Sequence, residues 1–263
     1  MTYNGTNSWL VDWEGGVALI DPGSEDETHL DAIIAECRGR LTHILLTHTH
    51  LDHLAGAVTL SRRLGVPTAG FRKSADSNFN ADIKLEDGDA IAGLSALHTP
   101  GHAMDHMCFA TSRGIADDGI IFSGDHVMGW STSVVPPPPY GDLLLFIASL
   151  ERIRDRHDRL MLSAHGPAIT APFETVQGLI EHRMARERSI AGLLTGIPSP
   201  IEILLGRAYF NLKPQLLGPA RANLLSHLCK LEADGIATRT EAGWFLQNPN
   251  TLNLQNPNTL NRT

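Results

Sequence analysis

The sequence predicts an α/β layered fold with a small helical unit at its C-terminal end, and three observations support this prediction. Short apolar strands alternate with helical stretches from residue 7 to residue 64, an order that is typical of layered α/β proteins. Polar loops, most of them with glycine, follow several of the strands. Beyond residue 182, two helical stretches and a hairpin form a separate pattern.

Length and composition limit the classes of function. A chain of 263 residues with 42% hydrophobic and 19% charged residues is ordinary for a globular protein of one large or two smaller domains. No apolar run is long enough to span a bilayer, so we expect no membrane partner. The net charge of −8 argues against a nucleic-acid surface. Three separated cysteines without a C-x-x-C spacing indicate buried free thiols and favour a cytoplasmic location.

Apolar runs and turn residues predict the elements of the first two-thirds of the chain. We expect strands at 7–10, 17–20, 44–46, 67–71, 83–85, 91–97, 107–110, 120–122 and 160–162, and helices at 25–38, 54–64, 143–156 and 172–194. The acidic run Glu25-Asp26-Glu27 suits the first turn of a helix. Glu86-Asp87-Gly88-Asp89 predicts a turn between two strands. The proline run 136–139 excludes helix and central strand, so we expect a stiff loop there.

The C-terminal unit is expected over residues 182–246. Pro200 and Pro219 each occupy a position that suits the first turn of a helix, and Gly235 ends the second helix. A short hairpin follows around Glu241-Ala242-Gly243. Two helices followed by a hairpin resemble a winged helix.

The end of the chain is repetitive. The eight residues LQNPNTLN occur twice in succession, from residue 246 to residue 261. Such Asn-rich and Pro-rich sequence cannot bury a core, so residues 247–263 are predicted to be disordered.

The stretch Thr47-His48-Thr49-His50-Leu51-Asp52-His53 is the strongest functional signal in the chain. It joins an apolar strand to a helix, at the carboxyl end of the strand, where sheet enzymes place their sites. Imidazole is a preferred zinc ligand, and a carboxylate beside it suits a divalent ion and its bound water. Three histidines and one aspartate in six positions therefore predict a metal site.

Three later loops repeat the same arrangement of a strand followed by potential ligands. They are His98-Thr99-Pro100-Gly101-His102, Ser123-Gly124-Asp125-His126 and Ser163-Ala164-His165-Gly166-Pro167. Each loop alone is a weak signal. Four such loops at the same ends of strands predict one shared site, in which His98 is expected to be structural and His126 to point away.

In this order, the motifs H-x-H-x-D-H, T-P-G-H, S-G-D and A-H-G resemble the metallo-β-lactamase superfamily. The resemblance covers about residues 5–181 and implies a catalytic domain over residues 1–181, with the αββα sandwich of that family and two metal ions at one edge of the sheets. An N-terminal strand usual in the family is expected to be missing. The implied ligands are His48, His50 and His102 for the first ion, Asp52, His53 and His165 for the second, and Asp125 as the bridge.

The resemblance implies a hydrolase that depends on two Zn²⁺ ions per chain. Two such ions can share a hydroxide of near-neutral pKa, which attacks a carbonyl or phosphorus centre without a Ser or Cys nucleophile. Asp52 is the candidate catalytic residue, because it can orient the hydroxide and pass on its proton. Iron or manganese can replace zinc, since all seven ligands offer nitrogen or oxygen.

Within the superfamily, the chain is most similar to the β-lactamase-like protein 2 group. The similarity depends on the motifs Gly5-Thr6-Asn7, Gly101 to Met107, Ser123-Gly124-Asp125, His182-Arg183, Arg186-Glu187 and Asn223 to Leu231. That group has a C-terminal winged-helix-like domain, and its members include a single-strand endoribonuclease and bacterial thioesterase-like hydrolases. True β-lactamases lack an aspartate at the position of Asp125, so only promiscuous β-lactamase activity is expected.

Three classes of function remain open from the sequence. The preferred one is hydrolysis of a small-molecule ester, thioester or lactone, with Trp130 and Tyr140 as candidate substrate contacts. His106, four residues after His102, is expected either to contact the substrate or to support the ligands from behind. The alternative is an RNA partner bound by the C-terminal unit, which has eight Lys and Arg against six Asp and Glu over residues 181–246. The third is a DNA-binding winged helix. A homodimer is also possible.

Overall fold

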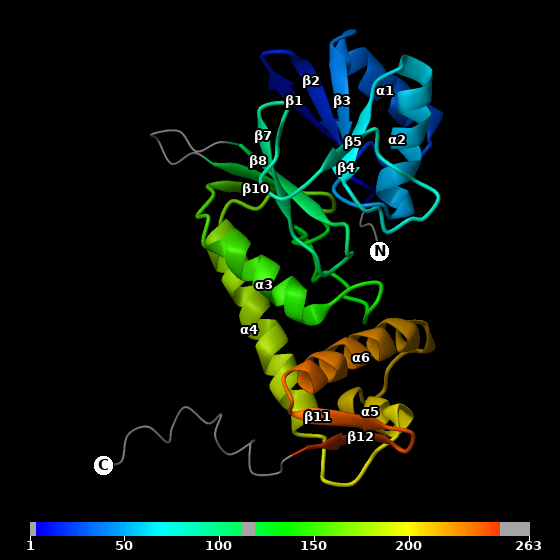
Figure 1. The fold of residues 1–263 in the computed structure, drawn as a ribbon, viewed down its shortest axis with the longest axis vertical. Helices are drawn as coiled ribbons and strands as arrows, with labels where there is room; N and C mark the ends of the chain where they lie inside the picture. Colours follow the sequence, from blue (N-terminus) through cyan, green and yellow to red (C-terminus); the bar gives the residue numbers. More distant parts are fainter. Residues whose placement is uncertain (1–3, 112–118, 248–263) are drawn as a thin grey trace, which may run out of the picture.

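The computed structural model describes residues 4–111 and 119–247. Two five-stranded sheets pack face to face, and a pair of helices covers the outer face of each (Figure 1). The first sheet has the order β1 (Trp9–Trp13), β2 (Gly16–Ile20), β3 (Leu41–Leu45), β4 (Thr68–Phe71) and β5 (Ile83–Leu85). The hairpin β1–β2 is antiparallel, and β2 to β5 are parallel.

The second sheet is mostly antiparallel. It has the order β10 (Leu160–Ser163), β9 (Ile120–Gly124), β8 (Met107–Thr111), β7 (Leu94–His98) and β6 (Ala90–Ile91). Only β9 and β10 run parallel, and α3 (Leu143–Arg154) connects them. Their carboxyl ends therefore meet at one edge of the sheet, next to each other.

Three apolar clusters hold the four layers together. The inner faces of the two sheets bury residues such as Ile20, Leu45 and Phe109 against each other. The outer face of the first sheet packs against α1 (Glu27–Cys37) and α2 (Leu51–Leu64). The outer face of the second sheet packs against α3 and the first half of α4 (Pro172–Ala191). This is the αββα sandwich that the sequence predicts, and both central layers are buried on both faces.

The turn at residues 86–89 lies between two strands, as predicted, but these strands, β5 and β6, belong to different sheets. It does not join two paired strands, because β5 pairs with β4 in the first sheet and the chain then crosses to the second sheet. The strand expected at 91–97 is also split, since Ala92 and Gly93 have positive φ angles and make a tight turn between β6 and β7. A local turn signal does not determine which sheet receives the next strand.

The C-terminal unit forms its own apolar cluster around Leu204, Leu224, Leu228 and Trp244. Its elements are α5 (Ile201–Ala208), a 3-10 turn (Pro214–Leu216), α6 (Leu217–Ala233) and the hairpin β11 (Ala237–Thr240) and β12 (Gly243–Leu246). Helix α4 passes from the sandwich into this unit, so the boundary predicted at residue 182 lies inside a continuous helix (Figure 1). The predicted disordered tail, from residue 248 onwards, lies outside the described residues.

Among the described residues, no helix is both long and apolar enough to cross a bilayer.

Candidate metal centre

The junction of β3 and α2 supplies four of the predicted ligands. The chain leaves β3 at Leu45, His50 is the N-cap residue of α2, and the helix begins at Leu51. Asp52 and His53 therefore lie in the first helical turn. The helix begins three residues earlier than residue 54, the start predicted from the sequence. An acidic side chain is favourable there, because the amino end of a helix carries a partial positive charge.

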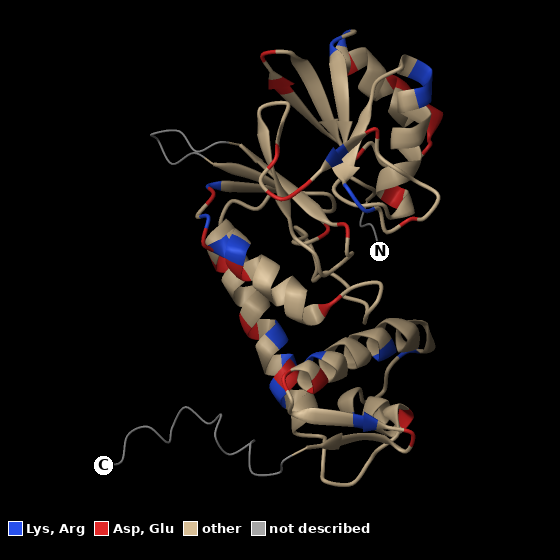
Figure 2. Ribbon diagram, in the orientation of Figure 1, with Lys and Arg blue, Asp and Glu red and all other residues tan. Residues whose placement is uncertain are grey.

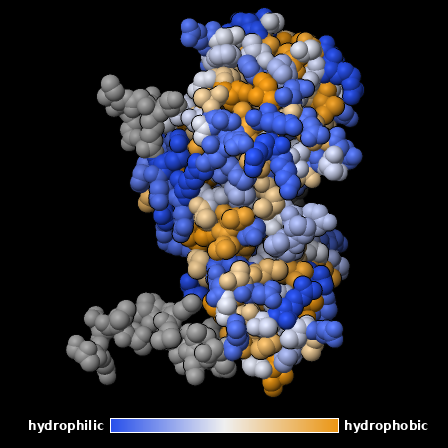
Figure 3. Space-filling view, in the orientation of Figure 1, coloured by the Kyte–Doolittle hydropathy of each residue, from blue (hydrophilic) through white to orange (hydrophobic). Residues whose placement is uncertain are grey.

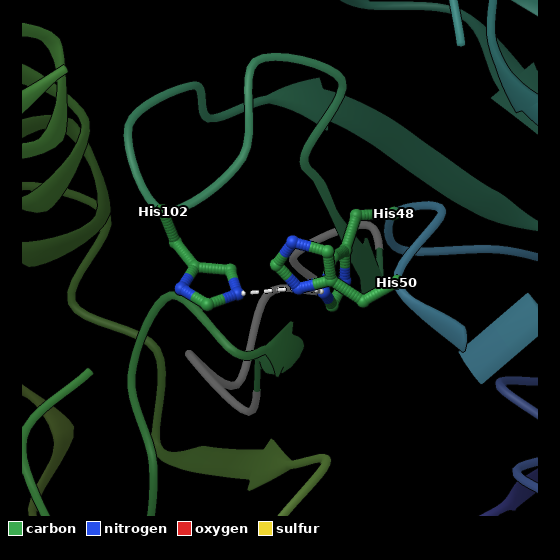
Figure 4. Close-up of side chains that lie close together, drawn as sticks. All are labelled: His48, His50 and His102. Carbon is green, nitrogen blue, oxygen red and sulfur yellow. Dashed lines mark hydrogen bonds between the residues drawn. The ribbon is translucent and has the colours of Figure 1, made fainter. Parts of the chain in front are cut away.

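The first set of ligands consists of His48, His50 and His102 (Figure 4). Nδ1 of His50 lies 2.8 Å from Nε2 of His48 and 3.1 Å from Nε2 of His102. The loop after β7 brings His102 to this position. Gly101 has a φ of +143°, and an added Cβ atom there would lie 2.4 Å from Cα of Phe146, so only glycine fits.

The second set consists of Asp52, His53 and His165. Nε2 of His165 lies 3.4 Å from Oδ2 of Asp52, and Nε2 of His53 lies 3.9 Å from the same oxygen. His165 follows β10 directly, so the parallel pair β9–β10 delivers it beside Asp125.

Asp125 lies between the two sets, at the end of β9. Its Oδ2 is 3.6 Å from Nε2 of His102 in the first set. Its Oδ1 is 3.1 Å from Nε2 of His165 and 3.6 Å from Nε2 of His53 in the second. One carboxylate thus faces both sets, which is the position that a bridging ligand requires.

The donor atoms fit divalent cations. Each of three groups has all its donor atoms within 4.8 Å of one another, and together the groups comprise the seven predicted ligands: His48, His50 and His102; His48, His53 and Asp125; and Asp52, His53 and His165. Nε2 of His53 and Oδ1 of Asp125 are buried and have no hydrogen-bond partner among the described residues. Unpaired buried donors and acceptors are costly, and a shared cation would satisfy both.

Hydrogen bonds behind the imidazoles direct Nε2 of several rings towards the cluster. Nδ1 of His102 donates to the carbonyl oxygen of Val134 at 2.7 Å, and Nδ1 of His165 donates to that of Gly5 at 3.0 Å. Nδ1 of His48 lies 3.1 Å from Oγ1 of Thr47, whose own proton goes to Asp21. Such contacts fix the tautomer that leaves Nε2 free for a cation.

Burial keeps the first set neutral. Burial, together with the neighbouring His53 and His102, holds the pKa of His48 well below its usual range. Burial also lowers the pKa of His50, and it lowers the pKa of His102 to about 4. All three imidazoles are therefore unprotonated at neutral pH, as a cation requires.

In the second set, neighbouring carboxylates raise the pKa values of the histidines. Burial lowers the pKa of His53, but Asp21 and Asp125 outweigh it and raise that pKa well above the usual range. For His165, contacts with Asp125 and Asp52 likewise overcome burial and raise the pKa to about 9. Although burial opposes ionisation of Asp125, its contacts with His165 and His53 hold its pKa well below the usual range. Without a cation, the second set is a network of protonated histidines and carboxylates.

Asp21 is a residue of the site that the sequence reasoning did not identify. This buried carboxylate lies 2.9 Å from Nδ1 of His53, and it accepts hydrogen bonds from the amide and the hydroxyl of Thr47 at 2.9 and 2.6 Å. It therefore orients His53 and the start of the ligand segment. A signal existed, because Asp21 directly follows the buried strand β2, just as the identified ligands follow theirs.

Asn7 is a second residue that was not given a role. Its side-chain amide donates to the carbonyl oxygens of Ser163 and Gly166, and its backbone amide donates to that of Ala164. These contacts hold the loop that carries His165. Nothing in the spacing of the ligands indicates such a role.

The predicted substrate contacts have different outcomes. His106 is fully buried, with Nε2 accepting from the amide of Asp125 at 3.2 Å and Nδ1 2.9 Å from Oγ1 of Thr99. It supports Asp125 from behind, which is one of the two roles expected for it, and it does not face the substrate. An added Cβ at Gly124 would lie 2.7 Å from this ring, so the glycine permits the close approach.

His98 stacks on Phe71 and is structural, as predicted. His126 is buried against Phe146.

Two cavities adjoin the cluster, and His50 lines both. The smaller, of about 180 Å³, contains the ligands Asp52, His102, Asp125 and His165, and Trp130 forms part of its wall. The larger, of about 720 Å³, is lined by Thr49, His50, Phe71, Lys73, Ser74, Ala75, Asp76, His98, Ala103, Met104, Pro139 and Tyr140. Trp130 and Tyr140 each line one of these cavities, and their contact with a substrate stays a prediction.

Comparison with known proteins identifies the family. The model of the metallo-beta-lactamase superfamily matches residues 1–165. The chain belongs to the metallo-beta-lactamase superfamily. The model of the beta-lactamase associated winged helix domain matches residues 201–244, which contain α5, α6 and most of the hairpin.

Curated relatives include a beta-lactamase-like protein 2 homolog from Drosophila melanogaster, 30% identical over 89% of this chain and 85% of its own length. An atrochrysone carboxyl ACP thioesterase from a Cryptosporiopsis species is 30% identical over 78% of this chain, which spans 62% of that protein. Among solved structures, a metallo-beta-lactamase family protein from Thermus thermophilus has a TM-score of 0.73 and 23% identity, and covers 92% of this chain and 93% of its own.

A structure of TTHA1623 in a di-iron-bound form is 27% identical, with a TM-score of 0.53, and covers 64% of this chain and 91% of its own. Together with the His and Asp groups, membership in the superfamily indicates a hydrolase that binds a divalent metal.

Proposed function

We propose that this chain hydrolyses a small-molecule ester, thioester or lactone with the aid of two zinc ions. The observation that carries the proposal is the position of His50, which lies between the ligand cluster and a large apolar cavity. Iron or manganese fits the same nitrogen and oxygen donors. When bound, such a metal pair supplies an activated water and polarises the carbonyl that it attacks.

The larger cavity suits the apolar part of an acyl substrate. Phe71, Ala103, Met104 and Pro139 give it apolar walls, and ligand pockets typically combine such walls with a few polar groups. Lys73 is exposed at this cavity and makes no ion pair with the described residues, so it offers a positive charge to an anionic group of the substrate. The thioesterase among the relatives supports a thioester in particular.

The chain's own residues then place and deprotonate the reactants. Asp52 is partly exposed at the smaller cavity, and its contact with His165 lowers its pKa, so it is ionised at neutral pH. It is therefore able to accept the proton of the attacking water. Trp130 forms a wall of the same cavity and limits the access of bulk water to the reacting carbonyl.

The RNA alternative finds less support in the C-terminal unit. Arg183 is buried, Arg221 pairs with Glu202, and Lys230 pairs with Glu187 and Asp234. Figure 2 shows basic and acidic residues interspersed along α4 rather than gathered into a continuous basic track. Binding along a single strand needs such a track together with exposed aromatic side chains. Trp244 is buried in the core of this unit, whereas Phe210 is exposed.

The DNA-binding alternative conflicts with the packing of α6. Ser226, His227 and Lys230 are buried, and α6 contacts α3 and α4. The helix that reads DNA in a winged helix must be free to enter the major groove.

The predicted cytoplasmic location and homodimer stay predictions. For the latter, Figure 3 shows hydrophobic side chains gathered over α3, which carries the exposed Leu144 and Leu145.

A substrate screen tests the proposal. Zinc-loaded protein is assayed with p-nitrophenyl esters, acyl-CoA thioesters, lactones, nitrocefin and a fluorescent single-stranded RNA. We expect turnover of an ester, thioester or lactone that is lost in Asp52→Ala and kept in Glu36→Ala, which removes an exposed carboxylate on α1. RNA cleavage that falls steeply with salt, without esterase activity, would replace this proposal with the ribonuclease.

A further inference from the structure

Residues 133–135 connect the C-terminal unit to both sets of ligands. We call this segment the strap; it comprises Ser133, Val134 and Val135, in the loop between β9 and α3. On one side, the carbonyl oxygen of Val134 accepts from Nδ1 of His102 at 2.7 Å. Oγ of Ser133 also donates to the carbonyl oxygen of Asp125 at 2.5 Å. The strap therefore contacts one ligand of the first set and the bridging aspartate.

On its other side, the strap accepts two hydrogen bonds from helices of the C-terminal unit. Nη2 of Arg183 on α4 donates to the carbonyl oxygen of Ser133. Oγ of Ser226 on α6 donates to the carbonyl oxygen of Val135 at 2.6 Å. These two carbonyls flank that of Val134, which holds His102. The three carbonyls together leave little freedom for the strap to shift.

The environment of Arg183 indicates that its role is specific. Its side chain is 4% exposed, it makes no ion pair with the described residues, and its Cζ lies 5.4 Å from the ring centre of Phe146. A buried cation without a carboxylate is costly. Nη1 and Nη2 of Arg183 have acceptors, whereas its buried Nε has none among the described residues. Nη1 of Arg183 donates to Oδ1 of Asn223 on α6 at 3.2 Å, and the amide of Asn223 donates to the hydroxyl of Tyr209 at 2.8 Å. The arginine thus ties the strap to α6 and to the end of α5.

We propose that Arg183 and Ser226 are positioning residues through which the C-terminal unit holds the strap, and with it the imidazole of His102, in the orientation that binds the first cation. In this role the winged helix is a structural part of the metal centre rather than a module that recruits nucleic acid. The inference rests on the metal binding of the proposed function, but not on its substrate. It explains why the hydroxyl of Ser226 on α6 is buried against the loop before α3.

The test measures metal affinity, so it does not depend on activity. In a His165→Ala background, which restricts tight binding to the first set, Zn²⁺ is titrated against a chelating indicator. Arg183→Met and Ser226→Ala each remove one donor to the strap. Arg188→Met and Ser189→Ala are the matched controls, because both residues are exposed on α4 and have no side-chain contact with the strap among the described residues. Thermal unfolding of the metal-free proteins reports any general loss of stability.

We expect the two strap variants to bind Zn²⁺ about tenfold more weakly than the controls, the size of effect typical of residues that orient a ligand. Arg183→Lys keeps a donor and is expected to recover part of the loss. Bound Co²⁺ should show a changed visible spectrum in the strap variants alone. Affinities and spectra equal to those of the controls would overturn the proposal.

Two further outcomes are distinguishable. If Arg183→Met fails to fold, Ser226→Ala decides, because it removes a single hydroxyl. If the protein without strap substitutions binds no metal, the proposed function fails. If that protein binds metal and the strap variants bind it equally well, only this inference is refuted.

Discussion

The two sets of ligands differ in the protonation state of their histidines when no cation is bound. In the first set, burial lowers the pKa values of His48, His50 and His102, so three neutral imidazoles converge. In the second, Asp21, Asp52 and Asp125 surround His53 and His165 and raise their pKa values. Histidines of the first set are thus neutral and able to bind a metal directly, whereas histidines of the second set carry a proton.

The difference follows from where each set lies in the fold. Imidazoles of the first set donate hydrogen bonds to neutral groups, such as the carbonyl oxygen of Val134 and the hydroxyl oxygen of Thr47. The second is built at the ends of β2 and β9 and at the start of α2, where three aspartates are placed. We infer that the first set binds a cation with little proton exchange, and that the second must release protons first.

The largest expected effect comes from removing the residue that the two sets share. Asp125→Ala deletes the carboxylate that faces both, so each of the two proposed cations would lose a ligand. We expect metal content to fall below one ion per chain and turnover to fall by about 10³-fold or more, as is typical when an activated water is lost. Elemental analysis and steady-state kinetics measure the two effects. Asp155→Ala, which removes an exposed carboxylate beyond α3, is the control, and an equal metal content in both variants would contradict the bridge.

The sequence predicted which residues come together in the cluster, because most of them follow a buried strand and strands of a sheet end at a common edge. His48, His102, Asp125 and His165 all obey this pattern, although they are far apart in the chain. The alternation of apolar strands and helices predicted a layered α/β fold, and the αββα sandwich was implied by the resemblance to the superfamily. The resemblance to the superfamily supplied the division of ligands between two ions.

The sequence did not predict the groups that act through other residues. The role of Asp21 depends on the approach of His53 from α2, and that of Arg183 on the packing of α4 against the strap. The role of His106 stayed open because its spacing from His102 allowed either direction, and only the packing of β8 against β9 buries it. These contacts depend on how strands pair and how helices pack over long distances in the chain. No local sequence pattern predicts them.

The pH dependence of binding compares the two sets directly. His165 has a pKa of about 9 and His53 a raised pKa, so both are protonated at pH 7 and a cation must displace their protons. Affinity of the second set should therefore rise from pH 7 to about pH 9, by about tenfold per pH unit for each proton released. The first set, with His102 near 4, should change little over this range. Zinc titrations of His102→Ala and His165→Ala, which leave one set each, measure the slopes, and equal slopes would refute the distinction.

The smallest expected effect comes from Asp21→Asn, which keeps the shape of the side chain and removes its charge from behind His53. Two consequences oppose each other at neutral pH. The pKa of His53 falls, which reduces competition by protons, but the ring also loses the partner that orients it. At a pH above the range in which the second set releases its protons, only the second consequence remains. We therefore expect about tenfold weaker binding by the second set there, together with a shallower pH slope below it. The control is Asp12→Asn, an exposed residue of β1 that pairs with Arg40. A slope as steep as that of the parent protein would show that Asp21 does not govern the proton on His53.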